Sequence, residues 1–203
     1  GINGPKFKDK PALIMAGSGD VITHQELNEL SNQGAQLFRS LGLKPGDSLA
    51  FMMENHKLFF PIAFAAYRSG LKYTAISWRL QASEVEYIVK DCGAKVFITS
   101  KFLEESAKDL SSSLEGVNKF MLDGESGDFL SYEDAIRNMP NTPIEDECQG
   151  ASMLYSSGTT GKPKGVSREI KISPLPYTPD EEDVGLTRLS LIHISEPTRQ
   201  LCI

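Results

Sequence analysis

Short apolar runs alternate with amphipathic segments along most of the sequence. Thr23, followed three residues later by Glu26, has the spacing of a helix-capping box, and leucines at helical intervals continue from there until Gly42. Three apolar runs with the length of buried strands follow, at 49–53, 73–76 and 94–99. Helical patterns lie between them at 56–68 and 83–92, and Ser83 is the expected cap of the second. Strands that alternate with helices predict βαβ units. We therefore expect an α/β fold with a mostly parallel sheet flanked by helices.

The second half of the sequence continues this alternation less regularly. Residues 101–114 look helical, 119–122 resemble a strand, 132–138 a short helix, and 140–147 a proline-containing acidic connection. The apolar run 151–155 then predicts another strand, and it leads directly into a loop rich in Ser, Thr, Gly and Lys. In parallel α/β sheets, ligands bind in loops beyond the carboxyl ends of the strands, so this loop is the first candidate for a site.

Composition excludes several function classes. The 203 residues carry a formal net charge of −6, and the pI is about 5.2, which argues against a nucleic-acid partner or a charged membrane surface. Three cysteines (Cys92, Cys148 and Cys202) are too few and too dispersed for a disulfide framework or a zinc site. The longest apolar run, 58–66, is far shorter than the ~18 residues of a membrane span. We expect a soluble cytoplasmic protein without a transmembrane segment, whose oligomeric state stays open.

The loop at 155–165 has the composition of a polyphosphate-binding site. Glycines let backbone amides approach an anion, hydroxyls add donors that can rotate, and lysines supply compact positive charges. It is not a Walker A loop, because Gly158 and Gly161 are only three positions apart and Pro163 follows Lys162 where Ser or Thr would open a helix. The residues expected to hold phosphates are Ser156, Ser157, Gly158, Thr159, Thr160, Gly161 and Lys164.

This loop resembles the signature of the adenylate-forming superfamily of AMP-dependent synthetases and ligases. Supporting segments occur in family order at 22–41, 42–53, 63–70, 76–80 and 84–94, so the resemblance covers roughly residues 10–166. Segment 76–80 with the following EVEYIVKDCGAK looks most like an acyl-CoA synthetase. The resemblance implies an acid:CoA ligase that uses ATP, Mg²⁺ and coenzyme A to convert a carboxylic acid into an acyl-adenylate and then a thioester.

The resemblance also implies roles for single residues. Thr159 and Thr160 would donate to the β- and γ-phosphates, and Lys164 would be the catalytic cation; Lys162 is left out of this set. No metal-ligating residue is predicted, since the acidic run 180–183 is typical of a solvated surface. We expect His24 and His56 to have capping or surface roles at helix starts. Trp78 is expected to pack against the strand before it.

The resemblance is incomplete after the loop. The family's later adenine-binding, ribose-binding, hinge and C-terminal lysine motifs do not follow, so residues 1–186 are expected to be an incomplete N-terminal part of the ligase domain and to be inactive alone. The stretch 189–199 (LSLIHISEPTR) resembles a translated transposase-end sequencing adapter, and 187–203 is therefore expected to be a non-native tail. Two alternatives stay open: an adenylation domain that loads a carrier protein, and a non-catalytic nucleotide-binding or interaction protein.

Overall fold

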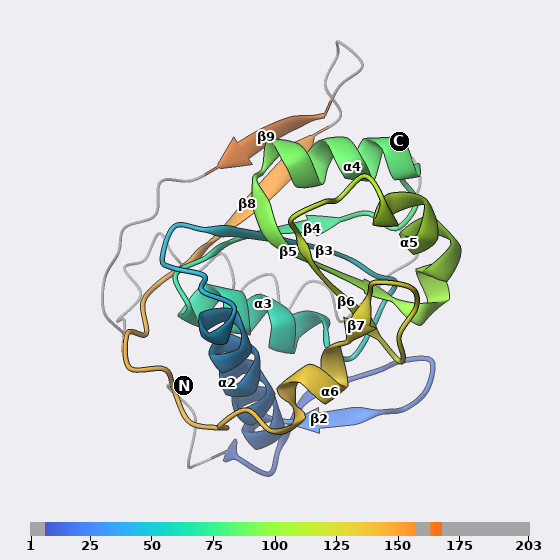
Figure 1. Ribbon diagram of the computed structural model, residues 1–203. Coiled ribbons are helices and arrows are strands. Elements are labelled where there is room, and N and C mark those ends of the chain that lie inside the picture. The colour runs from blue at the N-terminus through green and yellow to red at the C-terminus, as the bar shows by residue number, and fades with distance from the viewer. Residues whose placement is uncertain (1–6, 157–162, 168–203) are drawn as a thin grey trace.

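The computed structural model describes residues 7–156 and 163–167 (Figure 1). The predicted domain boundary at residue 186 and the predicted non-native tail lie outside these residues. The helices are α2 (His24–Ser40), α3 (Phe59–Arg68), α4 (Ala82–Asp91), α5 (Glu104–Ser111) and α6 (Tyr132–Arg137), with a 3₁₀ helix η1 (Lys101–Leu103). The strands are β1 (Pro11–Ile14), β2 (Val21–Thr23), β3 (Ser48–Met52), β4 (Lys72–Ile76), β5 (Ala94–Ser100), β6 (Asn118–Leu122), β7 (Leu130–Ser131), β8 (Ala151–Ser156) and β9 (Lys164–Ser167).

The centre of the fold is a seven-stranded sheet in the order β7-β6-β5-β3-β4-β8-β9. Every neighbouring pair is parallel except β8 with β9, which are antiparallel. Strands β1 and β2 form a separate two-stranded hairpin beside α2. The predicted α/β fold with a mostly parallel, helix-flanked sheet is therefore confirmed.

Helices cover both faces of the sheet, with α2, α3 and α6 on one face and α4 and α5 on the other (Figure 1). The alternation of side chains along each strand explains the two cores. In β3, Leu49 and Phe51 pack toward α2 and α3, whereas Ala50 and Met52 pack toward α4 and α5. Because both faces of β3 are buried, all five of its residues are buried, as its continuous apolar sequence predicts.

Helix boundaries follow the expected signals with two exceptions. Thr23 caps α2 as predicted, since its hydroxyl accepts from the Glu26 amide and the Glu26 carboxylate accepts from the Thr23 amide. The predicted cap of α4 at Ser83 is wrong: Gln81 is the N-cap residue and forms a capping box with Glu84. Helix α3 begins at Phe59 rather than at 56, because His56 and Lys57 form a turn in which the Leu58 amide donates to His56 Nδ1.

Polar side chains of α2 and α3 form hydrogen bonds and ion pairs with the connection from α6 to β8. Asn32 and Gln36 donate to the carbonyls of Asn141 and Thr142. Arg39 binds the Asp146 carboxylate at 3.0 Å, and Arg68 lies 3.3 Å from the Glu147 carboxylate. These contacts direct the chain into β8 and therefore determine where the candidate loop begins.

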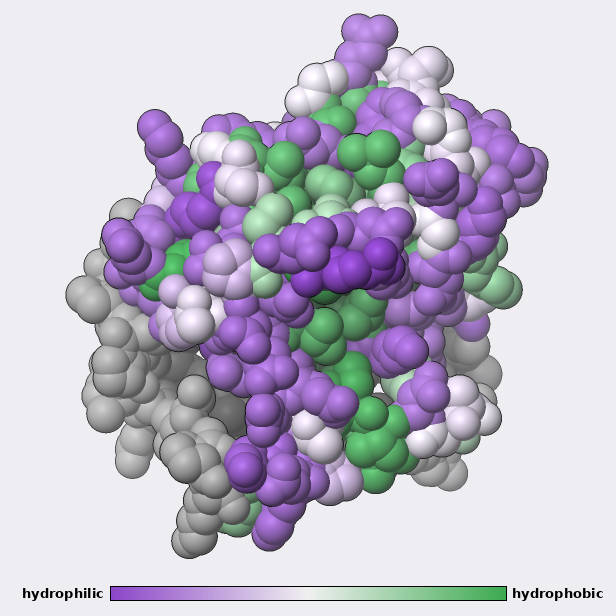
Figure 2. Space-filling view, turned by 60° about the horizontal axis from the view of Figure 1, so that its bottom comes forward, coloured by the Kyte–Doolittle hydropathy of each residue, from purple (hydrophilic) through white to green (hydrophobic). Residues whose placement is uncertain are grey.

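The surface over α2, α6 and the β1–β2 hairpin is largely hydrophilic, with smaller hydrophobic areas between the polar side chains (Figure 2). Among the described residues, no helix combines the length and apolar character that a membrane crossing requires.

Candidate functional site

The candidate loop connects β8 to β9. Ser156 is the last residue of β8 and lies opposite Lys164, the first residue of β9, in the antiparallel register. Both residues are exposed, and as directly opposed residues of an antiparallel pair they have their side chains on the same face of the hairpin at the base of the loop. The sequence pattern placed Lys164 in the loop, whereas the structure places it in a strand, where the backbone fixes its position. Ser157, Gly158, Thr159, Thr160 and Gly161 lie outside the described residues, so their predicted roles stay predictions.

A cavity of about 450 Å³ lies beside this base, at the carboxyl ends of β4 and β8. It is bounded on one side by Thr74 to Ser77 and on another by Leu80, Glu84 and Ile88 of the α4 region. Tyr155, Ser156 and Pro163 close it on the hairpin side. The lining is more apolar than polar, and one of its residues, Ser156, lies opposite Lys164 in the β8–β9 register.

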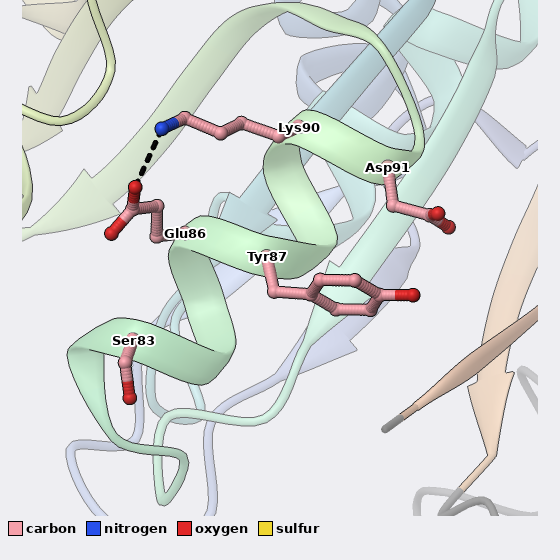
Figure 3. A pocket seen from close by; sticks show the side chains of 5 residues that line it. All are labelled: Ser83, Glu86, Tyr87, Lys90 and Asp91. Atoms are coloured by element: carbon pink, nitrogen blue, oxygen red, sulfur yellow. Dashed lines mark hydrogen bonds and ion pairs between the residues drawn. The ribbon is translucent and has the colours of Figure 1, made fainter.

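Tyr155 forms a hydrogen bond between the β8–β9 hairpin and α4. The hydroxyl of Tyr155 donates to Oδ2 of Asp91, the last residue of α4, at 2.5 Å. Burial, together with this hydrogen bond, raises the pKa of Tyr155, so the hydroxyl remains a donor at neutral pH. Figure 3 shows that Tyr87 and Asp91 project from one side of α4, away from the Glu86–Lys90 ion pair. These residues and Ser83 border a shallow surface groove along α4.

His24, His56 and Trp78 are not among the residues that line this cavity. His24 is the first residue of α2, as expected. His56 accepts from the Leu58 amide and also contacts Asp123 Oδ2 through Nε2 at 3.1 Å. The expected packing of Trp78 against its preceding strand is wrong: its side chain is 40% exposed, stands edge-on to Phe102, and has Arg79 over its ring.

Sequence reasoning did not find the contact between Tyr155 and Asp91 or the residues across the cavity from the loop. Asp91 is 64 positions from Tyr155, and its sequence surroundings indicate only the end of a helix. Tyr155 itself belongs to the motif, but a tyrosine in an apolar strand predicts burial rather than a particular partner.

The resemblance implies that ATP and Mg²⁺ bind at this site. The exposed Ser156–Lys164 pair fits a polyphosphate, because it supplies a hydroxyl donor and a positive charge. For Mg²⁺ the described residues offer no fit, since residues 7–156 and 163–167 contain no group of three or more acidic, His or Cys side chains arranged to hold a metal.

Comparison with known proteins agrees with this geometry. The sequence profile of the family described as AMP-binding enzyme matches residues 3–171. Because this match covers most of the chain, the protein belongs to the AMP-binding enzyme family, whose members form adenylates. The motif-based resemblance is thereby confirmed at the level of the family.

Curated relatives differ in the acceptor that their names state. An oxalate–CoA ligase of Arabidopsis thaliana is 29% identical over 201 residues, which are 93% of this chain and 39% of that protein. A fatty acid–[acyl-carrier-protein] ligase, ScoC of Streptomyces coeruleorubidus, is 27% identical over 77% of this chain and 29% of its own length. The chain thus spans well under half of these relatives, and their names divide between coenzyme A and a carrier protein.

Solved structures give the same result for the fold. An anthranilate CoA ligase, AuaEII, in complex with anthranoyl-AMP superposes with a TM-score of 0.70 at 25% identity, over 81% of this chain and 31% of that one. MbtA of Mycobacterium smegmatis superposes with a TM-score of 0.68 at 26% identity over 81% of this chain and 31% of that one. The sheet and its helices are therefore the arrangement found in adenylate-forming ligases.

Proposed function

We propose that this segment belongs to an ATP-dependent acid:CoA ligase. In the first step a carboxylate attacks the α-phosphate of ATP, which forms an acyl-adenylate and releases pyrophosphate. In the second step the thiol of coenzyme A attacks the acyl carbon and AMP leaves.

One observation supports the proposal most strongly. Lys164 and Ser156 lie opposite each other at the base of the Ser/Thr/Gly loop, and Ser156 lines a cavity at the carboxyl ends of β4 and β8. Negative charge grows on the departing pyrophosphate during adenylate formation, and donors already in place around it stabilise the transition state. Lys164 would supply positive charge, Ser156 a hydroxyl donor, and residues 157–161 further amide and hydroxyl donors.

The proposal also names coenzyme A as the acceptor of the acyl group. The resemblance of segment 76–80 to acyl-CoA synthetases and the oxalate–CoA ligase relative favour coenzyme A. The carrier-protein ligase relative favours a carrier-protein thiol as the second candidate.

The proposal is tested with a full-length enzyme that carries this segment. Adenylate formation is measured as acid-dependent exchange of labelled pyrophosphate into ATP over a panel of aliphatic, aromatic and dicarboxylic acids. We expect exchange with at least one acid and, after addition of coenzyme A, formation of its thioester. If pyrophosphate exchange occurs but the acyl group is transferred only to a carrier protein, the acceptor is the carrier protein and not coenzyme A. Absence of exchange with every acid would refute the ligase function.

A further inference from the structure

The part of β8 that carries the loop is not paired with the main sheet. Strand β8 pairs with β4 only through Ala151 and Ser152, whereas residues 153–156 pair with β9 alone. Beyond Ser152 the loop is thus carried by an antiparallel ribbon of two strands. Such a ribbon has little stability of its own in water, so its direction depends on side-chain contacts with the rest of the fold.

Tyr155 makes the polar contact between this ribbon and α4. Its hydroxyl donates to Asp91 Oδ2 at 2.5 Å, and its ring packs with Met153 against the core between α4 and the sheet. Asp91 belongs to a helix that is packed on the same core, so it offers a fixed acceptor. The remaining large apolar side chains of the ribbon, Leu154 and Val166, are more than 60% exposed and do not anchor it to the described residues.

Gly165 shows that the ring of Tyr155 has a defined place over β9. Gly165 lies opposite Tyr155 in the register. A Cβ atom at Gly165 would lie 3.0 Å from Cζ and 3.1 Å from the hydroxyl of Tyr155, and 2.5 Å from Cε of Met153. The absence of a side chain therefore lets the tyrosine lie across the ribbon and reach Asp91.

We propose that Tyr155 and Asp91 are positioning residues for ATP: their hydrogen bond fixes the ribbon on α4 and so fixes the phosphate-binding pair at its end. This inference rests on the proposed function. Ser156 directly follows Tyr155, and Lys164 directly precedes Gly165, which lies opposite Tyr155. The position of Tyr155 therefore determines the position of both phosphate-binding residues. A ribbon released from α4 would carry Ser156 and Lys164 away together.

The test compares Tyr155→Phe, Asp91→Ala and Asp91→Asn in a full-length enzyme. Tyr155→Phe removes only the donor, Asp91→Ala removes the acceptor, and Asp91→Asn retains an acceptor oxygen. Loss of one hydrogen bond to a charged acceptor should raise KM for ATP about tenfold in the first two variants, with KM for the acid unchanged. Asp91→Asn should restore most of the ATP affinity. The double variant should be no worse than either single one, because both remove the same interaction.

Tyr132→Phe is the matched control, since it removes the hydroxyl of a buried tyrosine that has no hydrogen-bond partner among the described residues. A second readout is amide hydrogen exchange of residues 153–156 and 164–167 in the 203-residue chain, which should accelerate in Tyr155→Phe and Asp91→Ala but not in the control. A wild-type KM for ATP together with an unchanged rate of amide hydrogen exchange in Tyr155→Phe and Asp91→Ala would overturn the positioning role. If the wild-type enzyme has no pyrophosphate exchange activity, the proposed function fails, and the hydrogen-exchange result alone decides whether the contact holds the ribbon.

Discussion

Replacement of Gly70 by alanine should destabilise the fold more than an ordinary glycine substitution. Gly70 ends the turn between α3 and β4 with φ +67°. A Cβ there would lie 2.4 Å from Sγ of Cys148 and 3.1 Å from Cβ of Pro45. The left-handed backbone costs an alanine about 1–2 kcal/mol, and overpacking adds about 1–3 kcal/mol, so we expect a total loss of about 2–5 kcal/mol.

Gly93 is the matched control. It has nearly the same backbone angle, φ +65°, but nothing lies within 4 Å of a Cβ built on it. Gly93→Ala should therefore cost only the backbone contribution of about 1–2 kcal/mol. Urea denaturation of both variants gives the free energies of unfolding directly. Equal losses for Gly70→Ala and Gly93→Ala would show that the clash with Cys148 does not exist.

A double variant tests the named contact. Cys148→Ala removes the sulfur that the new methyl group would meet, so Gly70→Ala with Cys148→Ala should lose less stability than the sum of the two single changes. Additive losses would contradict the packing described. The contact matters for the site because the Cys148 amide donates to the carbonyl of Arg68 just before the chain enters β8.

Two further predictions concern charged side chains. Arg39→Ala should lower the free energy of unfolding by about 2–3 kcal/mol, because Arg39 binds Asp146 and two backbone carbonyls. Arg137→Ala is the control, since Arg137 is exposed, and its free energy of unfolding in the same urea titration should stay within about 0.5 kcal/mol of the wild-type value. The hydrogen bond from Ser126, with Lys101 and Lys108 nearby, lowers the pKa of Glu104 from 4.5 to about 2. The ionised Glu104 carboxylate therefore stabilises the fold above pH 4.5, and this stabilisation is lost as the pH falls toward 2. The difference in urea midpoint between wild type and Glu104→Gln should shrink across this interval; a constant difference would contradict this assignment.

The order of elements could be predicted because its signals are local. The capping box at Thr23 and Glu26 and the apolar run from Leu49 to Met53 each specify an element within a few residues. The two errors at helix starts have equally local causes. Gln81 is a less common cap than Ser83, and the turn at His56 depends on an imidazole that accepts from the Leu58 amide.

The arrangement at the site could be predicted only in part. The composition of the loop indicates phosphate binding, but β9 was missed because four residues beginning Lys-Gly carry little strand signal, and their pairing depends on β8. The contact of Tyr155 with Asp91 joins segments far apart in the sequence, and only the packing of α4 on the sheet brings them together. Local patterns thus identified the chemistry of the loop but not the contacts that hold it.

Pyrophosphate exchange in Lys164→Ala tests the central claim most directly. Lys57→Ala is the control, because Lys57 is an exposed lysine whose ion pair, with Asp20, lies outside the site. If Lys164 stabilises the departing pyrophosphate, its loss should lower acid-dependent ATP–pyrophosphate exchange by about 10²- to 10³-fold in the full-length enzyme, and Thr160→Ala should also weaken it strongly. Lys57→Ala should retain the wild-type rate. Wild-type exchange in both Lys164→Ala and Thr160→Ala would contradict the assignment of this loop to ATP.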